Sequence, residues 1–186
     1  MMLPMWSNLV SNPRRGPQVL GLFILTLGVG ALALPALGRM DVRGVSIIDV
    51  ELMRTSAKAA EVVARLGPEG VDAARTSIYL DYPFLLVYAL FLSAACVVLA
   101  ARAADRGAST LASAGRTIAW AAPIAAGLDA IENVALLLVL DGRVDQPWPA
   151  IAFGCAAVKF VLLGAVIVYL VVTTVVLFRR TPAPAP

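Results

Sequence analysis

The sequence contains no histidine, only two cysteines and few charged residues. Without histidine, the chain cannot form a Ser-His-Asp or Cys-His catalytic arrangement, and it cannot bind zinc or haem through imidazole. Two cysteines are too few for a disulfide scaffold. Cys96 and Cys155 both lie within apolar runs, which favours buried structural thiols over a redox pair.

Only 15% of the 186 residues are charged, whereas 60% are hydrophobic. A soluble domain has about 25% charged and roughly 45–50% apolar residues. The composition therefore indicates that lipid is the solvent of this chain, and it excludes a disordered chain and a conventional soluble enzyme. The length suits one domain, so we expect residues 1–186 to form a single membrane domain.

Four apolar runs are long enough to cross a membrane, which requires roughly 20 helical residues. The predicted fold class is therefore all-α, an integral-membrane four-helix bundle. The predicted spans cover residues 17–38, 77–101, 117–140 and 148–178. An alternative for the first run is a cleaved signal sequence, because Arg14 and Arg15 precede it and Ala31-Leu32-Ala33 resembles a cleavage site. Its apolar stretch is, however, longer than the roughly 7–15 residues of a signal sequence.

The net charge of +3 does not predict nucleic-acid binding, because the basic residues gather at the ends of apolar runs rather than in one stripe. With the N-terminus inside, the inner segments carry seven arginines against one aspartate, whereas the outer segments carry seven basic and eight acidic residues. The positive-inside rule then predicts a multi-pass protein of the cell membrane with both termini in the cytoplasm.

The predicted outer segment, residues 44–76, has helical periodicity. Apolar residues alternate there with charged ones, as in an amphipathic helix, and Gly67-Pro68 is predicted to end this helix. A second short helix, residues 69–76, is predicted to run into the second span. The amphipathic helix could lie on the bilayer surface or act as a lid over an outward-opening cavity. The Pro/Ala tail at residues 181–186 is predicted to be disordered.

Four ionisable residues fall within the predicted spans, where each costs at least ~2.5–3.5 kcal/mol on insertion scales. Asp81 is on the second span, Asp129 and Glu132 are on the third, and Lys159 is on the fourth. Asp129, Glu132 and Asn133 share one helical face because they are spaced i, i+3 and i+4. All lie in the outer half or near the midplane. We therefore expect one polar cavity, walled by spans two to four and opening outward.

Two interpretations of this cluster remain open. In the structural one, Lys159 pairs with Glu132 or Asp129 between helices, and Asn133 contributes to packing. In the catalytic one, one lysine cannot neutralise three carboxylates, so at least one keeps its proton and acts as a general acid. Asp129 or Glu132 is the expected acid, with Asp81 as a third candidate. The candidates for substrate binding are Asn133, Lys159, Tyr88, Phe84, Tyr82 and Trp148.

The catalytic interpretation predicts an acid-catalysed cyclase or isomerase of an apolar, isoprenoid-type small molecule. Protonation of an alkene or epoxide requires a dry acid, and aromatic or apolar walls then shield the carbocation. Such chemistry requires no metal and no cofactor. One alternative is a proton-coupled transporter of small molecules, and another is a protein that binds a lipid or partner in the same pocket without chemistry. The sequence leaves open whether the chain forms a homo-oligomer.

Two short segments carry a family resemblance: Tyr79-Leu80-Asp81-Tyr82 and Leu128-Asp129-Ala130-Ile131-Glu132-Asn133. In a four-span chain of this size, they resemble the small integral-membrane terpene cyclases of bacterial indole-terpenoid pathways. The same features are similar to those of unassigned bacterial four-span membrane proteins. The first resemblance covers the four-helix body and implies a bacterial enzyme that cyclises a prenyl chain by carboxylic-acid protonation.

Overall fold

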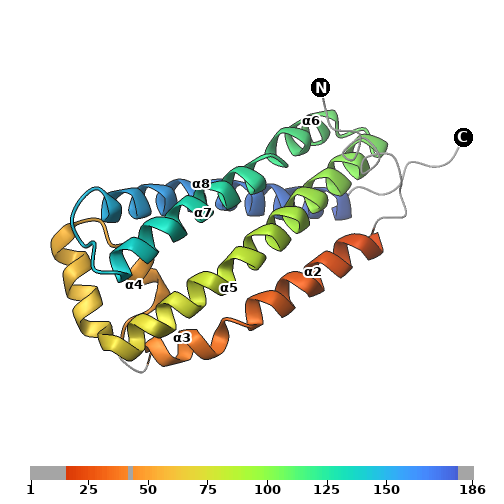
Figure 1. Cartoon of the computed structure of the whole chain (residues 1–186). Helices are drawn as coiled ribbons and strands as arrows, with labels where there is room; N and C mark the ends of the chain where they lie inside the picture. The colour runs from red at the N-terminus through yellow and green to blue at the C-terminus, as the bar shows by residue number, and fades with distance from the viewer. Residues whose placement is uncertain (1–15, 42–43, 180–186) are drawn as a thin grey trace, which may run out of the picture.

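The computed structural model describes residues 16–41 and 44–179, and this part of the chain contains helices and no strands (Figure 1). The predicted disordered tail at residues 181–186 lies outside the described residues. The helices, in chain order, are α2 (Gly16–Ala31), α3 (Leu34–Asp41), α4 (Ile47–Glu51), α5 (Ser56–Asp105), α6 (Ser109–Ile118), α7 (Ala121–Leu140) and α8 (Trp148–Arg179). The all-helical fold class is thus confirmed.

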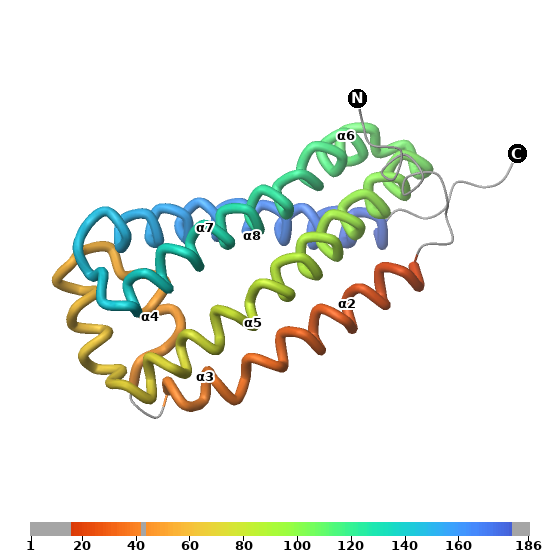
Figure 2. Tube along the Cα trace, viewed as in Figure 1, coloured from red at the N-terminus to blue at the C-terminus, as the bar shows by residue number. Residues whose placement is uncertain are grey.

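Three helical stretches are long and apolar enough to cross a membrane: α5, the α6–α7 pair over Ser109–Leu140, and α8. They contain the predicted spans at residues 77–101, 117–140 and 148–178. α2 and α3 reach the required length only as a pair, which is bent by 41°. α5 and α7 pack together, α7 packs along α8, and the start of α2 lies at the same end as the end of α8 (Figure 2).

The bend between α2 and α3 corrects the prediction of one continuous helix over residues 17–38. The Leu32 N–H donates to the Val29 carbonyl at 3.1 Å, and the Ala33 N–H to the Gly30 carbonyl at 3.2 Å. These bonds span three residues instead of the four of an α-helix. The following Pro35 explains the change, because it lacks an N–H and its ring clashes with the carbonyl four residues earlier.

The segment between α3 and the second span differs in part from the prediction. The predicted helix of the outer segment is divided into α4 and the first part of α5, with residues 52–55 non-helical between them. Gly67 then interrupts α5 with φ 61° and ψ −179°, and the helix resumes at Pro68 and continues to Asp105. The predicted break at Gly67-Pro68 and the predicted continuation into the second span are therefore confirmed. Glycine suits this position because it adopts positive φ without steric penalty.

The largest buried cluster lies where α3, α4 and the first part of α5 meet the end of α7 and the start of α8. Its fully buried members include Met40, Val50, Met53, Leu66 and Val139. α4 packs against α5, α7 and α8. α4 therefore packs onto the helices of the bundle through Val50, while Ile48 on the same helix stays 56% exposed.

A second buried cluster contains Cys96 and Tyr169, which pack with Val97, Ala119 and Val166. Both cysteines are free thiols; Cys96 is fully buried as expected, whereas Cys155 is only partly buried, which corrects the expectation for that residue. Tyr169 on α8 donates a hydrogen bond of 3.2 Å to the Leu111 carbonyl on α6. This hydrogen bond joins α8 to α6 at the edge of the second cluster.

Gly115→Ala should destabilise this second cluster. A Cβ at Gly115 on α6 would overlap the Tyr169 hydroxyl and would lie 2.8 Å from the Cβ of Ala100 on α5. Neither neighbour is the end of a flexible chain, so helices must shift. We expect a loss of about 1–3 kcal/mol in the free energy of unfolding, measured in detergent micelles.

Gly127→Ala is the matched control, because a Cβ at this exposed position on α7 would meet nothing within 4 Å. Alanine is the better helix former by roughly 0.5–1 kcal/mol, so this variant should be at least as stable as the wild type. Equal stability of the two variants would show that the contact between α6 and α8 is looser than described.

Candidate functional site

Lys159 on α8 is the centre of a buried ion cluster. Its Nζ lies 2.8 Å from Asp129 Oδ1 and 2.8 Å from Glu132 Oε2, both on α7. A third carboxylate oxygen, Glu51 Oε1 on α4, lies 3.8 Å from the same nitrogen. Lys159, Asp129 and Glu132 are all buried. Both ion pairs that the structural interpretation offered as alternatives are thus present together.

Asp129 uses both carboxylate oxygens in this cluster. Oδ1 accepts from Lys159, and Oδ2 accepts a hydrogen bond of 3.1 Å from the Tyr88 hydroxyl on α5. The Tyr88 ring in turn contacts the Phe84 ring, with centroids 5.4 Å apart. Asp129 therefore joins α5, α7 and α8. Each of its two carboxylate oxygens accepts a hydrogen bond, one from an ammonium group and one from a hydroxyl group.

Glu132 is the least satisfied member of the cluster. Its side chain is completely buried, and among the described residues its Oε1 has no hydrogen-bond partner. Its Oε2 is close to Lys159 Nζ but is outside hydrogen-bond geometry. A buried charge without full pairing is costly, and here one ammonium group faces three carboxyl groups.

Asp81 and Asn133 form a second polar contact beside this cluster. The Asn133 side-chain amide on α7 donates a hydrogen bond of 2.7 Å to Asp81 Oδ2 on α5. Within the described part of the chain, the lysine's ion pairs go to other carboxylates. Asp81 is therefore held by a neutral donor, although it is on the same side of the bundle as the ion cluster.

A cavity of about 250 Å³ lies next to the Asp81–Asn133 contact. Its polar lining consists of Glu51, Ser77, Asp81 and Asn133. The remaining lining residues are Val29, Gly30, Ala33, Leu37, Ile47, Ile78, Leu80, Phe84 and Leu136. α2, α3 and α4 thus form walls together with α5 and α7. This corrects the expectation that spans two to four enclose the cavity, because α8 supplies none of these residues.

The candidate residues divide into two groups around this cavity. Asp81, Phe84 and Asn133 line it, whereas Asp129, Glu132, Lys159 and Tyr88 pack behind its walls. Tyr82 and Trp148 are partly buried and pack against the largest buried cluster. Gly30 lets the Phe84 ring approach α2, because a Cβ at Gly30 would lie 3.1 Å from that ring.

Glu51 is a site residue that the sequence analysis missed. The helical periodicity of residues 44–76 predicts one amphipathic helix with its charged residues, Glu51 among them, on the polar face, whereas Glu51 ends the separate helix α4 and lines the cavity. The sequence does contain a sign that a separate helix begins at residue 47. Ser46 and Asp49 have the spacing of a capping box, which starts a helix. Thr55 then caps a new helix at Ser56, which leaves Glu51 on a short helix between two turns.

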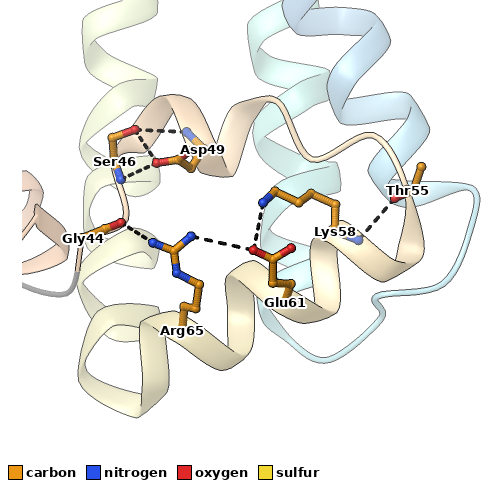
Figure 3. Close-up of polar contacts among 7 residues, drawn as sticks. All are labelled: Gly44, Ser46, Asp49, Thr55, Lys58, Glu61 and Arg65. Carbon is orange, nitrogen blue, oxygen red and sulfur yellow. Dashed lines mark hydrogen bonds and ion pairs between the residues drawn. The ribbon is translucent and has the colours of Figure 1, made fainter.

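Polar contacts with α5 fix the start of α4 (Figure 3). Ser46 Oγ accepts from the Asp49 N–H at 3.2 Å, and the Ser46 N–H donates to Asp49 Oδ2 at 2.8 Å. The hydrogen bond with the Ser46 side chain lowers the pKa of Asp49. Arg65 on α5 donates to the Gly44 carbonyl at 2.6 Å. These contacts place α4 at one end of the bundle, where Glu51 reaches the cavity.

The two polar groups described above therefore differ in chemistry. The ion cluster around Lys159, called the lysine cluster below, is buried and ionic. The Asp81 carboxyl group instead faces a cavity with mostly apolar walls. Comparison of the chain with family models, curated proteins and solved structures gave no match in any of the three.

Proposed function

We propose that the protein is a membrane-embedded, acid-catalysed cyclase or isomerase of a small isoprenoid-type substrate. The observation that supports this proposal is the Asp81 carboxyl on the wall of an otherwise largely apolar cavity. The volume of about 250 Å³ is slightly below the roughly 300–1,000 Å³ of small-molecule sites. It suits a short prenyl compound, or the reacting end of a longer one.

The proposal places the protein in the cell membrane as a four-span bundle, with the bent α2–α3 pair as the first span and both termini in the cytoplasm. Support for lipid contact comes from the large apolar side chains that α2 and α8 expose. Examples are Leu20, Ile24, Val161, Val168 and Phe178. An apolar substrate dissolved in the bilayer would then have direct access to the helices that surround the cavity.

Asp81 is the proposed acid because its hydrogen-bond donor is the neutral Asn133 amide, and within the described residues its carboxyl group makes no direct ion pair. Lys159 is occupied by Asp129 and Glu132 at 2.8 Å. Asn133 donates to Asp81 Oδ2, which leaves Oδ1 to carry a proton and orients the carboxyl group. The ion cluster then has a positioning role, because Glu132 directly precedes Asn133 on α7.

The proposed reaction begins with transfer of the Asp81 proton to one carbon of a C=C bond. A C–H bond forms, the π bond breaks, and a carbocation results. The Phe84 ring lines the same cavity, and its π face attracts a cation. In a cyclase, a second double bond attacks the cation first. Loss of a proton from a neighbouring carbon then restores a double bond, so the substrate and product are isomers and no oxidant or reductant is consumed.

The test is a labelling experiment with the full-length protein in lipid nanodiscs. Geraniol, linalool and myrcene are incubated in deuterated water, and products are analysed by mass spectrometry. We expect at least one compound to yield an isomer with a deuterium atom at carbon, and empty nanodiscs to yield none. If every compound stayed unlabelled and unchanged, the proposal would be rejected. Binding of these compounds without labelling would instead assign the cavity to transport or to lipid binding.

A further inference from the structure

We infer that Glu51 is the base that removes the proton from the carbocation. This inference rests on the proposed function, in which Asp81 supplies the proton. Glu51 and Asp81 line the same cavity from different helices, α4 and α5. Two carboxyl groups on separate walls can serve two different carbons of one bound substrate, one as donor and one as acceptor.

Glu51 is the least constrained carboxylate around Lys159. Its Oε1 is 3.8 Å from the lysine nitrogen, whereas Asp129 and Glu132 approach to 2.8 Å. Its side chain keeps 20% of its surface exposed, compared with 0% for Glu132. Lys159 therefore stabilises the ionised form of Glu51 without occupying it fully, and the carboxylate remains accessible from the cavity.

Burial also makes Glu51 a better base than a carboxylate in water. Desolvation raises the pKa of Glu51, and the nearby ammonium group of Lys159 opposes this shift. A proton acceptor works best when its pKa is close to the operating pH, where it is ionised and still binds a proton strongly. These effects support the assignment, which stands on the position of Glu51 in the cavity.

α4 holds Glu51 in place on both sides. Val50 and Met53 are fully buried in the largest cluster. In the turn after α4, the Gln146 side chain donates to the Arg54 carbonyl at 3.2 Å, and the Arg54 guanidinium lies 5.4 Å from the centre of the Phe153 ring. These contacts on both sides of residue 51 hold the Glu51 carboxyl group at the cavity wall.

One reaction cycle neither consumes nor produces a net proton. Asp81 loses one proton to the substrate, and Glu51 gains one when a C–H bond of the carbocation breaks and the new double bond forms. After product release Asp81 is ionised and Glu51 is protonated. Transfer of that proton from Glu51 to solvent, and uptake of one by Asp81, returns both groups to their starting states.

Glu51→Gln separates the two proton transfers in the labelling experiment. We expect product formation to fall by about 10²-fold or more, because the base is lost. Deuterium should still enter the recovered substrate, because Asp81 can protonate the double bond and take a proton back from the same carbon. Glu51→Asp should restore part of the product formation. Asp81→Asn should reduce both product formation and labelling by about 10²–10⁴-fold.

Glu61→Gln is the matched control, since Glu61 is an exposed glutamate on the first part of α5. It should form product at the wild-type rate. If Glu51→Gln also did so while Asp81→Asn were inactive, the inference would be overturned and the proposed function would stand. Loss of both product and labelling in a stably folded Glu51→Gln would overturn the inference as well. Labelling that persisted in Asp81→Asn would reject both proposals.

Discussion

Replacing Lys159 with methionine should lower the free energy of unfolding by about 3–5 kcal/mol, the typical effect of removing one partner from a buried ion pair. Methionine fills much of the same volume but leaves Asp129 and Glu132 buried without a cation. The loss is measured by denaturant unfolding in detergent micelles, followed through the intrinsic fluorescence of the three tryptophans.

Lys58→Met is the matched control, because Lys58 pairs with Glu61 at 2.9 Å while both side chains are about half exposed. Exposed pairs of this kind contribute about 0–1 kcal/mol. Adding Asp129→Asn and Glu132→Gln to Lys159→Met should recover much of the lost stability, because the buried group is then neutral. If Lys159→Met and Lys58→Met unfolded alike, the lysine cluster would not be a buried ionic network.

Asp81→Asn should reduce turnover by about 10²–10⁴-fold, the usual contribution of a general acid. The substitution preserves shape, and the oxygen of the new amide can still accept the hydrogen bond that Asn133 donates. The fold should therefore remain intact while the proton that starts the reaction is missing. Product formation and deuterium incorporation are measured together, with the unfolding midpoint of the same preparation.

Asp72→Asn provides the comparison, because Asp72 lies on the same helix with 74% of its side chain exposed. Its turnover should match that of the wild type. If Asp81→Asn and Asp72→Asn had equal turnover, Asp81 would not be the acid, and the cavity would lose the group that supports the proposed function.

Local patterns were sufficient to predict much of the fold. Long apolar runs with few charges identified the positions of α5, α7 and α8, and Gly67-Pro68 marked the interruption of α5. The spacing of Asp129 and Glu132 placed both on one helix face, where Lys159 meets them. The helix positions and the break at Gly67-Pro68 depend on residues close in sequence. The pairing with Lys159 could be predicted because few charged residues lie in the apolar runs.

The cavity walls could not be predicted in the same way. α2 is apolar around its whole circumference, so no periodicity marks the face that Val29 and Gly30 present to the cavity. Glu51 looked like a solvated residue because its burial depends on how α4 packs against α7 and α8, far along the chain. The charge and hydropathy pattern also gives no sign of the bend between α2 and α3. Pro35 changes the backbone geometry there, but it does not interrupt the apolar run.

The bent pair α2–α3 packs mainly against α5, while the lysine cluster is built from α4, α5, α7 and α8. The residues that shape the cavity on the α2–α3 side and the ion pairs that join the other helices therefore come from different parts of the chain. Substitutions at Val29, Gly30 or Ala33 can change which molecules fit without disturbing the ionic network. Under the proposed function, the α2–α3 pair can therefore change the substrate range while the remaining helices keep the chain folded.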